Sequence, residues 1–249
     1  MKQLPTLPLA AALLLSATAA SAQTTCRLGL RGGLNRALTT VDPAGNSSGS
    51  YPYSYATDKS ALYAWQAGVV GEIRSGKFAF QPALVFSQKG EKASSSLYAS
   101  GFTGYSIAIT NSTNRYNWLE LPLNVVYTLH GDHGLQVFAG PYVALAVGGR
   151  QQGTTGSTSY YGPVYDPLPA QQTDFDKSID YGPGTNNRRL DAGVNFGVGY
   201  RQGPVQVQLG YVLGLRNLHQ PTDIGGINFQ AYAAHNRVAQ LTATYFFGG

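Results

Sequence analysis

The chain has 249 residues, enough for one domain of ordinary size, and its formal net charge at neutral pH is +5. Only 12% of its residues are charged, against about 25% in a typical soluble domain, whereas glycine contributes 31 residues and tyrosine 17. The mild positive charge does not favour a nucleic-acid-binding protein, and the single cysteine, Cys26, excludes an intramolecular disulfide.

The N-terminal segment has the three parts of a secretory signal peptide in their usual order. Lys2 comes first, an apolar run follows at 7–15, and the small residues of 20–22 precede Gln23. We predict that residues 1–22 are a signal peptide. Its removal takes away one basic residue and leaves a formal net charge of +4. A buried N-terminal helix is the alternative interpretation.

The mature chain, residues 23–249, is predicted to be one β-barrel domain. Its sequence has no later run of about 18 apolar residues that would cross a membrane as a helix. Lipid cannot satisfy the open edge of a sheet, so a membrane-spanning chain without such helices must form a closed barrel. The residues before Cys26 do not resemble a lipoprotein processing site, so a lipid anchor is the less favoured role for this cysteine.

In chain order, eight segments alternate apolar and polar residues with the period of two that indicates a β-strand. The predicted strands are 26–35, 62–74, 78–92, 115–129, 134–147, 191–201, 204–215 and 237–247. In the fourth of them, Leu119, Leu121 and Leu123 alternate with Glu120 and Asn124. One row of each strand is continuously apolar, whereas the opposite row carries acids, amides and glycines. This pattern indicates that the apolar row faces lipid and the polar row faces the lumen.

The connections between these strands alternate between long polar segments and tight turns. The long segments are 36–61, 93–114, 149–190 and 216–236. Outer-membrane barrels have short periplasmic turns and long outer loops. We therefore predict an all-β fold, an eight-stranded antiparallel up-and-down transmembrane β-barrel with short periplasmic turns and long outer loops, located in the cell outer membrane.

Several short motifs resemble one family of barrel proteins. They are LGLRGGLN at 28–35, AGVVGEI at 67–73, FQPALVFSQKGEK at 80–92, LELPLNVVY at 119–127, FAGPYVALAVGG at 138–149, DAGVNFGVGY at 191–200 and LGYVLGLRNL at 209–218. Their order and spacing resemble the small outer-membrane β-barrel proteins of the PorT-like, porin-family type, common in Bacteroidota. The resemblance covers nearly the whole mature chain. An aromatic-ended last strand matches as well. The resemblance implies the fold and the outer-membrane location, and it implies no substrate or reaction. In this chain the last aromatic residue, Phe247, is followed by two glycines.

Charged residues on the inward rows predict a network inside the barrel. The interior of an eight-stranded barrel is just wide enough for side chains to fill it. We predict a plugged lumen with ion pairs and amides around Glu72 and Glu120, since a carboxylate buried alone would be very costly. The predicted network consists of Arg31, Glu72, Arg74, Lys89, Glu120 and Arg201. The alternative is that these groups lie near the rims, in water, where ion pairs contribute little.

The predicted outer loops are rich in tyrosine, serine, glycine and asparagine. Such a composition suits adaptable binding surfaces, so an extracellular ligand is a possible partner of these loops. The candidate contact residues are Tyr51, Tyr53, Tyr55, Tyr160 and Tyr161. The alternative is that these tyrosines belong to the aromatic girdle at the membrane interface or to mobile loops.

The sequence gives little support for catalysis. His130 and His133 flank Asp132 in a tight turn, which we interpret as a solvated turn because metal sites usually need three or four ligands of set geometry. Asp174, Asp176 and Asp180 lack the spacing of an EF-hand calcium loop, and no nucleophile-elbow motif occurs. We expect no enzyme activity, no cofactor and no metal site.

The leading hypothesis is a monomeric, non-enzymatic outer-membrane barrel with a structural or surface-interaction role. Its expected partners are outer-membrane lipid, periplasmic chaperones and the barrel-assembly machinery, and no nucleic acid. Three alternatives remain open. They are a narrow porin-like channel for small solutes, a soluble lipocalin-like binder with an apolar interior, and a membrane-embedded hydrolase or acyltransferase on the same scaffold.

Overall fold

The computed structural model describes residues 24–40, 44–47, 53–100, 104–161, 171–182, 184–220, 222–224, 227–229 and 233–248. Its strands are β1 (Thr25–Thr40), β2 (Ala44–Ser47), β3 (Tyr53–Ser75), β4 (Phe78–Ser100), β5 (Gly104–His130), β6 (His133–Tyr161), β7 (Gln171–Ser178), β8 (Leu190–Gln202), β9 (Val205–Gly214), β10 (Thr222–Ile224), β11 (Ile227–Phe229) and β12 (His235–Phe247). The described residues contain no helix that is long and apolar enough to cross a membrane.

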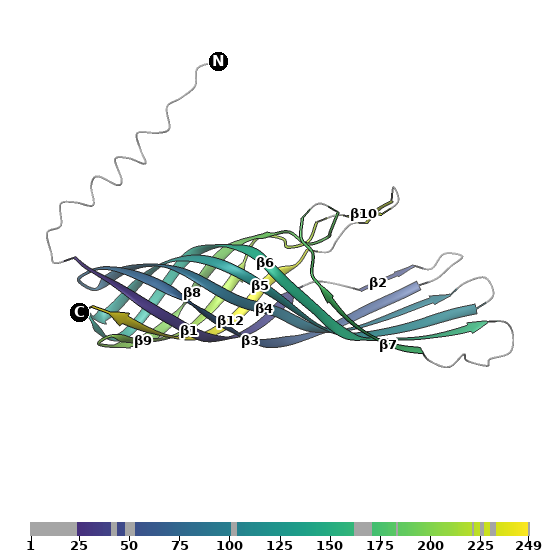
Figure 1. The fold of residues 1–249 in the computed structure, drawn as a ribbon, viewed down its shortest axis with the longest axis horizontal. Coiled ribbons are helices and arrows are strands. Elements are labelled where there is room, and N and C mark those ends of the chain that lie inside the picture. The colour runs from purple at the N-terminus through teal and green to yellow at the C-terminus, as the bar shows by residue number, and fades with distance from the viewer. Residues whose placement is uncertain are drawn as a thin grey trace, which may run out of the picture.

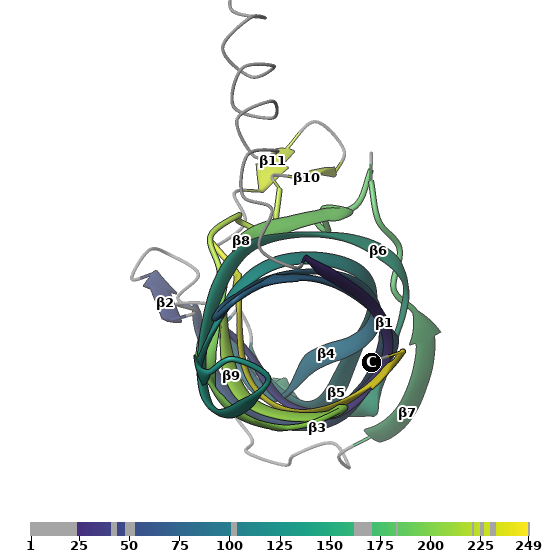
Figure 2. The ribbon, with the colours of Figure 1, turned by 90° about the vertical axis from the view of Figure 1, so that its left-hand side faces the viewer.

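Eight of the described strands form a closed antiparallel ring. The order is β1, β12, β9, β8, β6, β5, β4 and β3, and the ring closes because β1 pairs with β12 on one side and with β3 on the other. Figure 2 shows this ring end-on, with β2 and β7 outside it. The all-β antiparallel barrel predicted from the sequence is therefore confirmed.

Short turns join the strands at one end of the barrel. Gly76, Gly131 and Gly203 occupy these turns with φ values of 58°, 76° and 55°, a left-handed backbone that glycine adopts without a steric cost. β1 begins and β12 ends at this same end, as Figure 1 shows. The opposite end, which we call the outer end, carries the longer connections.

The wall of the barrel is apolar outside and polar inside. On β1, Leu34 is 63% exposed whereas its neighbour Asn35 is fully buried, and the same alternation recurs in β4, β6, β9 and β12. The exposed leucine, valine and phenylalanine side chains form a belt around the ring, and the buried side chains are largely amides, hydroxyls and ions. This is the reverse of a soluble lipocalin-like barrel, which would have an apolar interior, and it is the arrangement of a membrane-spanning barrel.

The predicted strand bounds are wrong at the outer end. β4, β5 and β6 continue as paired strands through the predicted loop at 93–114 and through the first part of the predicted loop at 149–190. Figure 1 shows these extensions projecting beyond the ring, with β2 and β7 at their sides. Serine, threonine, asparagine and glycine dominate the extensions, with a few apolar side chains such as Leu97 and Ile109 among them. The continuous apolar row that marks a membrane strand is therefore missing although backbone pairing continues.

Two connecting segments come together at the outer end of the ring. The segment after β7 bonds to β6 through Ile179 N and Gly149 O at 3.1 Å. It then bonds to the segment after β9, where Arg188 N donates to Leu218 O at 2.8 Å, and Leu218 N in turn donates to Ala234 O at 2.8 Å. These backbone bonds hold both segments against the inside of the barrel mouth.

Candidate functional site: the lumen and the outer mouth

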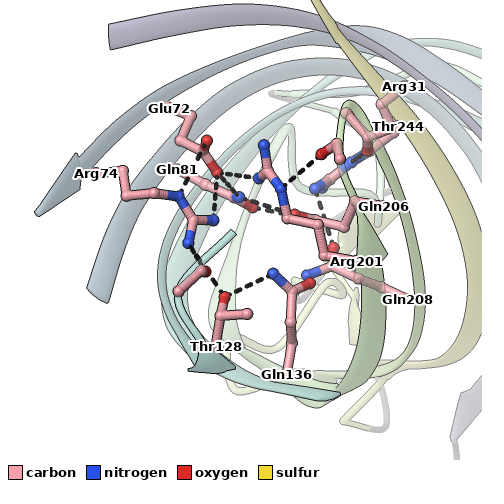
Figure 3. Close-up of polar contacts among 12 residues, drawn as sticks. Arg31, Glu72, Arg74, Gln81, Thr128, Gln136, Arg201, Gln206, Gln208 and Thr244 are labelled. Atoms are coloured by element: carbon pink, nitrogen blue, oxygen red, sulfur yellow. Dashed lines mark hydrogen bonds and ion pairs between the residues drawn. The ribbon is translucent and has the colours of Figure 1, made fainter. Parts of the chain in front are cut away.

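Glu72 on β3 is the centre of the polar network in the half of the lumen near the short turns (Figure 3). Its carboxylate accepts hydrogen bonds from Arg201 Nη1 at 2.6 Å, from Arg74 Nη2 at 3.1 Å and from Gln81 Nε2 at 2.8 Å. Glu72 is 1% exposed and Arg201 is fully buried. Two cations and one anion therefore share a site from which water is largely excluded.

Arg74 extends the network to the short-turn end. Its Nη1 donates to Thr128 Oγ1 at 3.4 Å and to the carbonyl oxygen of Gly131 in the β5–β6 turn. Thr128 Oγ1 also accepts from Gln136 Nε2 at 2.9 Å. These contacts tie β3, β5 and β6 together across the interior and fill this end of the lumen.

Arg201 joins the Glu72 network to the other side of the ring, where Arg31 has partners of its own. Arg201 Nε donates to Gly203 O at 3.0 Å, and its guanidinium lies 4.7 Å from the centre of the Phe246 ring. Arg31 Nε donates to Thr244 Oγ1 at 3.1 Å, and its Nη2 donates to Gln208 Oε1 at 3.1 Å. The acceptors of Arg31 are thus neutral groups on β12 and β9, as Figure 3 shows.

A second ion pair lies further along the lumen. Lys89 Nζ is 2.7 Å from Glu120 Oε1, with an orientation that makes an ion pair but not a well-aligned hydrogen bond. Lys89 is fully buried and its Nζ lies 5.0 Å from the centre of the Tyr142 ring. Tyr142 OH in turn donates to Asp191 Oδ2 at 2.8 Å.

The structure places all six residues of the predicted network inside the barrel. It joins Glu72 with Arg74 and Arg201, and it joins Lys89 with Glu120. It leaves Arg31 apart from both carboxylates, on neutral partners.

Asp191 is a lumen acid that the sequence argument missed. It is 1% exposed and also accepts from Asn236 Nδ2 at 2.8 Å. Its position on the same row as Gly193 and Asn195 was the available signal, because residues two apart on a strand share a face.

Little open space remains between the two ion-pair groups. The cavity there has a volume of about 20 Å³, roughly that of one water molecule. Arg31, Glu120, Asn124, Asn195 and Gln208 contribute to its polar lining. The described side chains therefore fill this part of the lumen almost completely.

An apolar cluster closes the lumen on the outer side of the second ion pair. Its buried members are Ala37, Trp118, Tyr142, Ala144, Ala146, Val212, Leu218, Ala234 and Val238. Tyr116 and Tyr181 pack against it, and the rings of Trp118 and Tyr181 meet edge to face at 6.5 Å. A space of only about 10 Å³ is left beside these rings. We call this cluster the aromatic plug.

Above the aromatic plug, the outer mouth opens into a cavity of about 950 Å³, which we call the vestibule. Its walls come from the outer parts of β3, β4, β5 and β6 and from the segments at 177–180 and 184–187. Glu91, 2% exposed, lies in this wall and accepts from Asn114 Nδ2 at 2.9 Å and from Tyr116 OH at 3.4 Å. Lys59 Nζ is 3.8 Å from the same carboxylate.

The side chains of all five predicted tyrosine contacts lie outside the described part of the structure. Tyr51 lies outside the described residues. The backbones of Tyr53 and Tyr55 belong to β3, where they pair with β2, and those of Tyr160 and Tyr161 belong to β6, but the positions of their side chains are outside the description.

The histidine turn and the outer aspartates lie on the surface. The rings of His130 and His133 stack at 5.8 Å, and His133 Nδ1 lies 3.0 Å from Asp132 Oδ1, an interaction that lowers the pKa of the aspartate. At the outer end, the Arg150 guanidinium donates two hydrogen bonds to Asp176 and lowers the pKa of that carboxyl. Among the described residues no group of three or more histidine, cysteine or acidic side chains is placed to hold a metal.

Comparison with known proteins assigns a family to this architecture. Residues 21–220 match the family model described as outer membrane protein beta-barrel domain. No curated protein sequence matches the chain. A solved structure of OmpT, an outer membrane protein of Vibrio cholerae in its trimer form, aligns over 90% of this chain and 100% of its own, with 11% identity and a TM-score of 0.13. That similarity is too low to carry an argument.

Proposed function

The chain belongs to the outer membrane protein beta-barrel domain family, and from this premise we propose that it is a non-enzymatic barrel whose lumen conducts no solutes. Membership of the family places the protein in the outer membrane. In the proposed role the barrel is a rigid anchor, and the extended outer strands carry a surface-interaction function.

The packing of the lumen is the observation that supports a non-conducting barrel. The Glu72 network, the Lys89–Glu120 pair and the aromatic plug follow one another along the interior, and the spaces between them are about 20 Å³ and 10 Å³. A hydrated ion or a sugar needs a continuous path several times wider than one water molecule. Moving a buried ion pair out of the way would leave charges unpaired in a medium of low dielectric constant.

Planar-bilayer recording tests this proposal directly. The purified protein should insert, as judged by protease protection in the same membranes, and should give no step-like currents in concentrated potassium chloride. The control is Trp118→Gly, which removes the largest buried side chain of the aromatic plug and should give at most brief openings, because the Glu72 network remains. Stable openings of the unaltered protein would overturn the proposal.

A narrow channel is the second candidate, and one observation favours it. Several buried polar atoms along the lumen, Asn124 Oδ1, Asn195 Oδ1 and Gln208 Nε2 among them, make no hydrogen bond to the described part of the chain. Such groups bind water readily. If side-chain movement joined these positions into a file of water molecules, proton flux into protein-loaded vesicles would exceed that of empty ones while potassium currents stayed absent.

Four further features of the role are part of the proposal. We propose that residues 1–22 are cleaved on export, that the barrel is monomeric, that periplasmic chaperones and the barrel-assembly machinery insert it, and that it belongs to the PorT-like type within the family. The short motifs from 28–35 to 209–218 support the last point. An intact mass of the purified protein that includes Lys2 would contradict the cleavage.

A further inference from the structure

We propose that the vestibule binds a neutral, polyhydroxylated solute such as a short oligosaccharide. The site is separate from the lumen network and goes beyond the anchoring role. It rests on one part of the proposed function, that the outer end of the barrel faces the exterior. The size of the vestibule, its closed floor, its unpaired acceptors and its charge support this assignment.

The vestibule has the dimensions of a small-molecule site. Pockets that bind such molecules typically have volumes of about 300–1,000 Å³, and the vestibule measures about 950 Å³. Its floor is shared with the outer surface of the aromatic plug through Tyr116, Asn187 and His219. A solute that enters from outside therefore meets a closed end, which is the geometry of a binding site and not of a transit path.

The wall contains acceptors that the protein leaves unpaired. Glu91 Oε1 receives the bonds from Asn114 and Tyr116, but Glu91 Oε2 is buried and makes no hydrogen bond to the described part of the chain. Asn114 Oδ1 is likewise buried and makes no hydrogen bond to the described part of the chain. An unsatisfied buried acceptor is costly, so a small side-chain shift that opens these two atoms to the vestibule would let the hydroxyl groups of a solute supply the missing donors.

The other side chains that line the vestibule can donate or accept hydrogen bonds, and the lining as a whole carries no net charge. The hydroxyl and amide side chains of the wall are Thr57, Ser95, Thr110, Ser112, Gln151, Ser178, Thr185, Asn186 and Asn187. The charged residues are two lysines, Lys59 and Lys177, and two acids, Glu91 and Asp180, whose formal charges cancel. A wall of mixed donors and acceptors with no net charge suits a sugar better than a phosphate, a nucleotide or a metal ion.

The test is a binding measurement on the full barrel in lauryldimethylamine oxide, a detergent without a sugar headgroup. Saturation-transfer NMR would be recorded with maltotriose, raffinose and tri-N-acetylchitotriose as neutral probes, and with glucuronic acid and glucosamine as charged ones. We expect transfer to at least one neutral probe and weaker transfer to both charged probes. Absence of transfer to every neutral probe, or stronger transfer to a charged one, would overturn the inference.

Two neighbouring serines on β4 provide a matched pair of variants. Ser95 lines the vestibule and not the neighbouring groove, whereas Ser94 lines that groove and not the vestibule, although the two spaces share Lys59, Ala93 and Ser112. Ser95→Trp should fill the vestibule and weaken binding by about tenfold or more, while Ser94→Trp should bind like the unaltered protein. Equal binding by the two variants, or equal loss, would contradict the assignment of the site.

Glu91→Gln keeps the shape of the wall and replaces one of its acceptors with a donor. We expect sugar binding to weaken by about tenfold or more, because the new amide donor would face a hydroxyl donor of the sugar and the hydrogen bond would be lost. A heat-modifiability gel establishes that each variant is folded. Conductance of the same samples separates the two proposals. A barrel that conducts ions and binds sugar refutes only the closed lumen. A barrel that neither conducts ions nor binds sugar refutes only the vestibule site.

Discussion

Replacing Glu72 with glutamine removes the one carboxylate among the described residues that pairs with the buried guanidinium groups of Arg74 and Arg201. Its Oε2 lies 2.6 Å from Arg201 Nη1 and 3.1 Å from Arg74 Nη2, and both arginines are at most 5% exposed. Glutamine has nearly the same shape, but it carries no charge and exchanges one acceptor oxygen for a donor. Arg74 and Arg201 would then face each other without a counter-ion.

The expected loss of stability is large for a single isosteric change. Removing one partner of a buried ion pair typically costs about 3–5 kcal/mol, because the other charge is left uncompensated. Here two cations lose the same partner, so we place Glu72→Gln at the upper end of that range. With a urea dependence of about 1–3 kcal/mol per molar, the unfolding midpoint should fall by more than about 1 M.

Urea unfolding in detergent, followed on gels of unheated samples, measures this midpoint, because folded barrels migrate differently from unfolded ones. The matched control is Asp176→Asn, which breaks the solvent-exposed pair with Arg150 and should leave the midpoint unchanged. Adding Arg201→Gln to Glu72→Gln should restore part of the stability, because one unpaired cation is removed. If Glu72→Gln and the control unfold at the same urea concentration, the network does not stabilise the barrel and the reasoning is refuted.

Three other measurements test separate parts of the structure. In Trp65→Phe the fluorescence of the remaining Trp118, which is buried, should resist quenching by brominated detergent. In Trp118→Phe the fluorescence of the remaining Trp65, which is 48% exposed on the belt, should be quenched. Equal quenching in the two variants would contradict the orientation of the wall. Gly197→Ala should destabilise the barrel by about 1–3 kcal/mol, because its new methyl group would collide with the backbone carbonyl oxygen of Leu209 and lie 2.7 Å from the Cα atom of Gly210; an unchanged urea midpoint would contradict that close approach. On acidification the contribution of Asp176 to the β6–β7 pairing should be complete above the ordinary pKa of aspartate and should be lost progressively as the pH falls from that value through the lowered pKa of Asp176; hydrogen exchange of the β7 amides that slows over this range would contradict this sign.

The membrane-spanning part of the fold could be predicted because lipid and lumen impose opposite demands on alternate residues. Leu34 and Asn35 are neighbours on β1, yet one is 63% exposed and the other fully buried, and this contrast is visible in the sequence as a period of two. The same rule identified which charges face inward. It could not identify partners, because Glu72 and Arg201 are 129 residues apart and meet only when the ring is closed.

The outer end could not be predicted by the same rule. Beyond the belt both faces of the sheet meet water, so residues such as Ser94, Ser95 and Thr110 carry no apolar alternation even though they lie on paired strands. The β-branched and aromatic residues of these strand extensions were the remaining signal for β-structure. That signal is weaker, because β-propensity depends on context. The vestibule was missed for this reason, since its walls were interpreted as loops.

Trp118 shows a further limit of the period-two rule. Its place on the polar row of β5 predicts correctly that it faces inward, and it is 1% exposed. The rule gives no reason for an indole to be there. Its environment comes from Tyr181 and Leu218, which belong to two connecting segments that fold back into the mouth. Contacts made by such segments depend on tertiary structure and leave no local pattern.

The pairing of β1 with β12 has a consequence for how the protein is made. Leu28 lies opposite Phe247 and Thr40 opposite His235, so the first and last strands of the ring come from opposite ends of the chain. Until the final strand arrives, two rows of backbone amides and carbonyls have no partner, and hydrocarbon offers them none. A ribosome-stalled or proteolytically shortened chain that lacks the last strand therefore has no partly formed barrel that is stable in the bilayer. Export must deliver the whole polypeptide before insertion becomes irreversible.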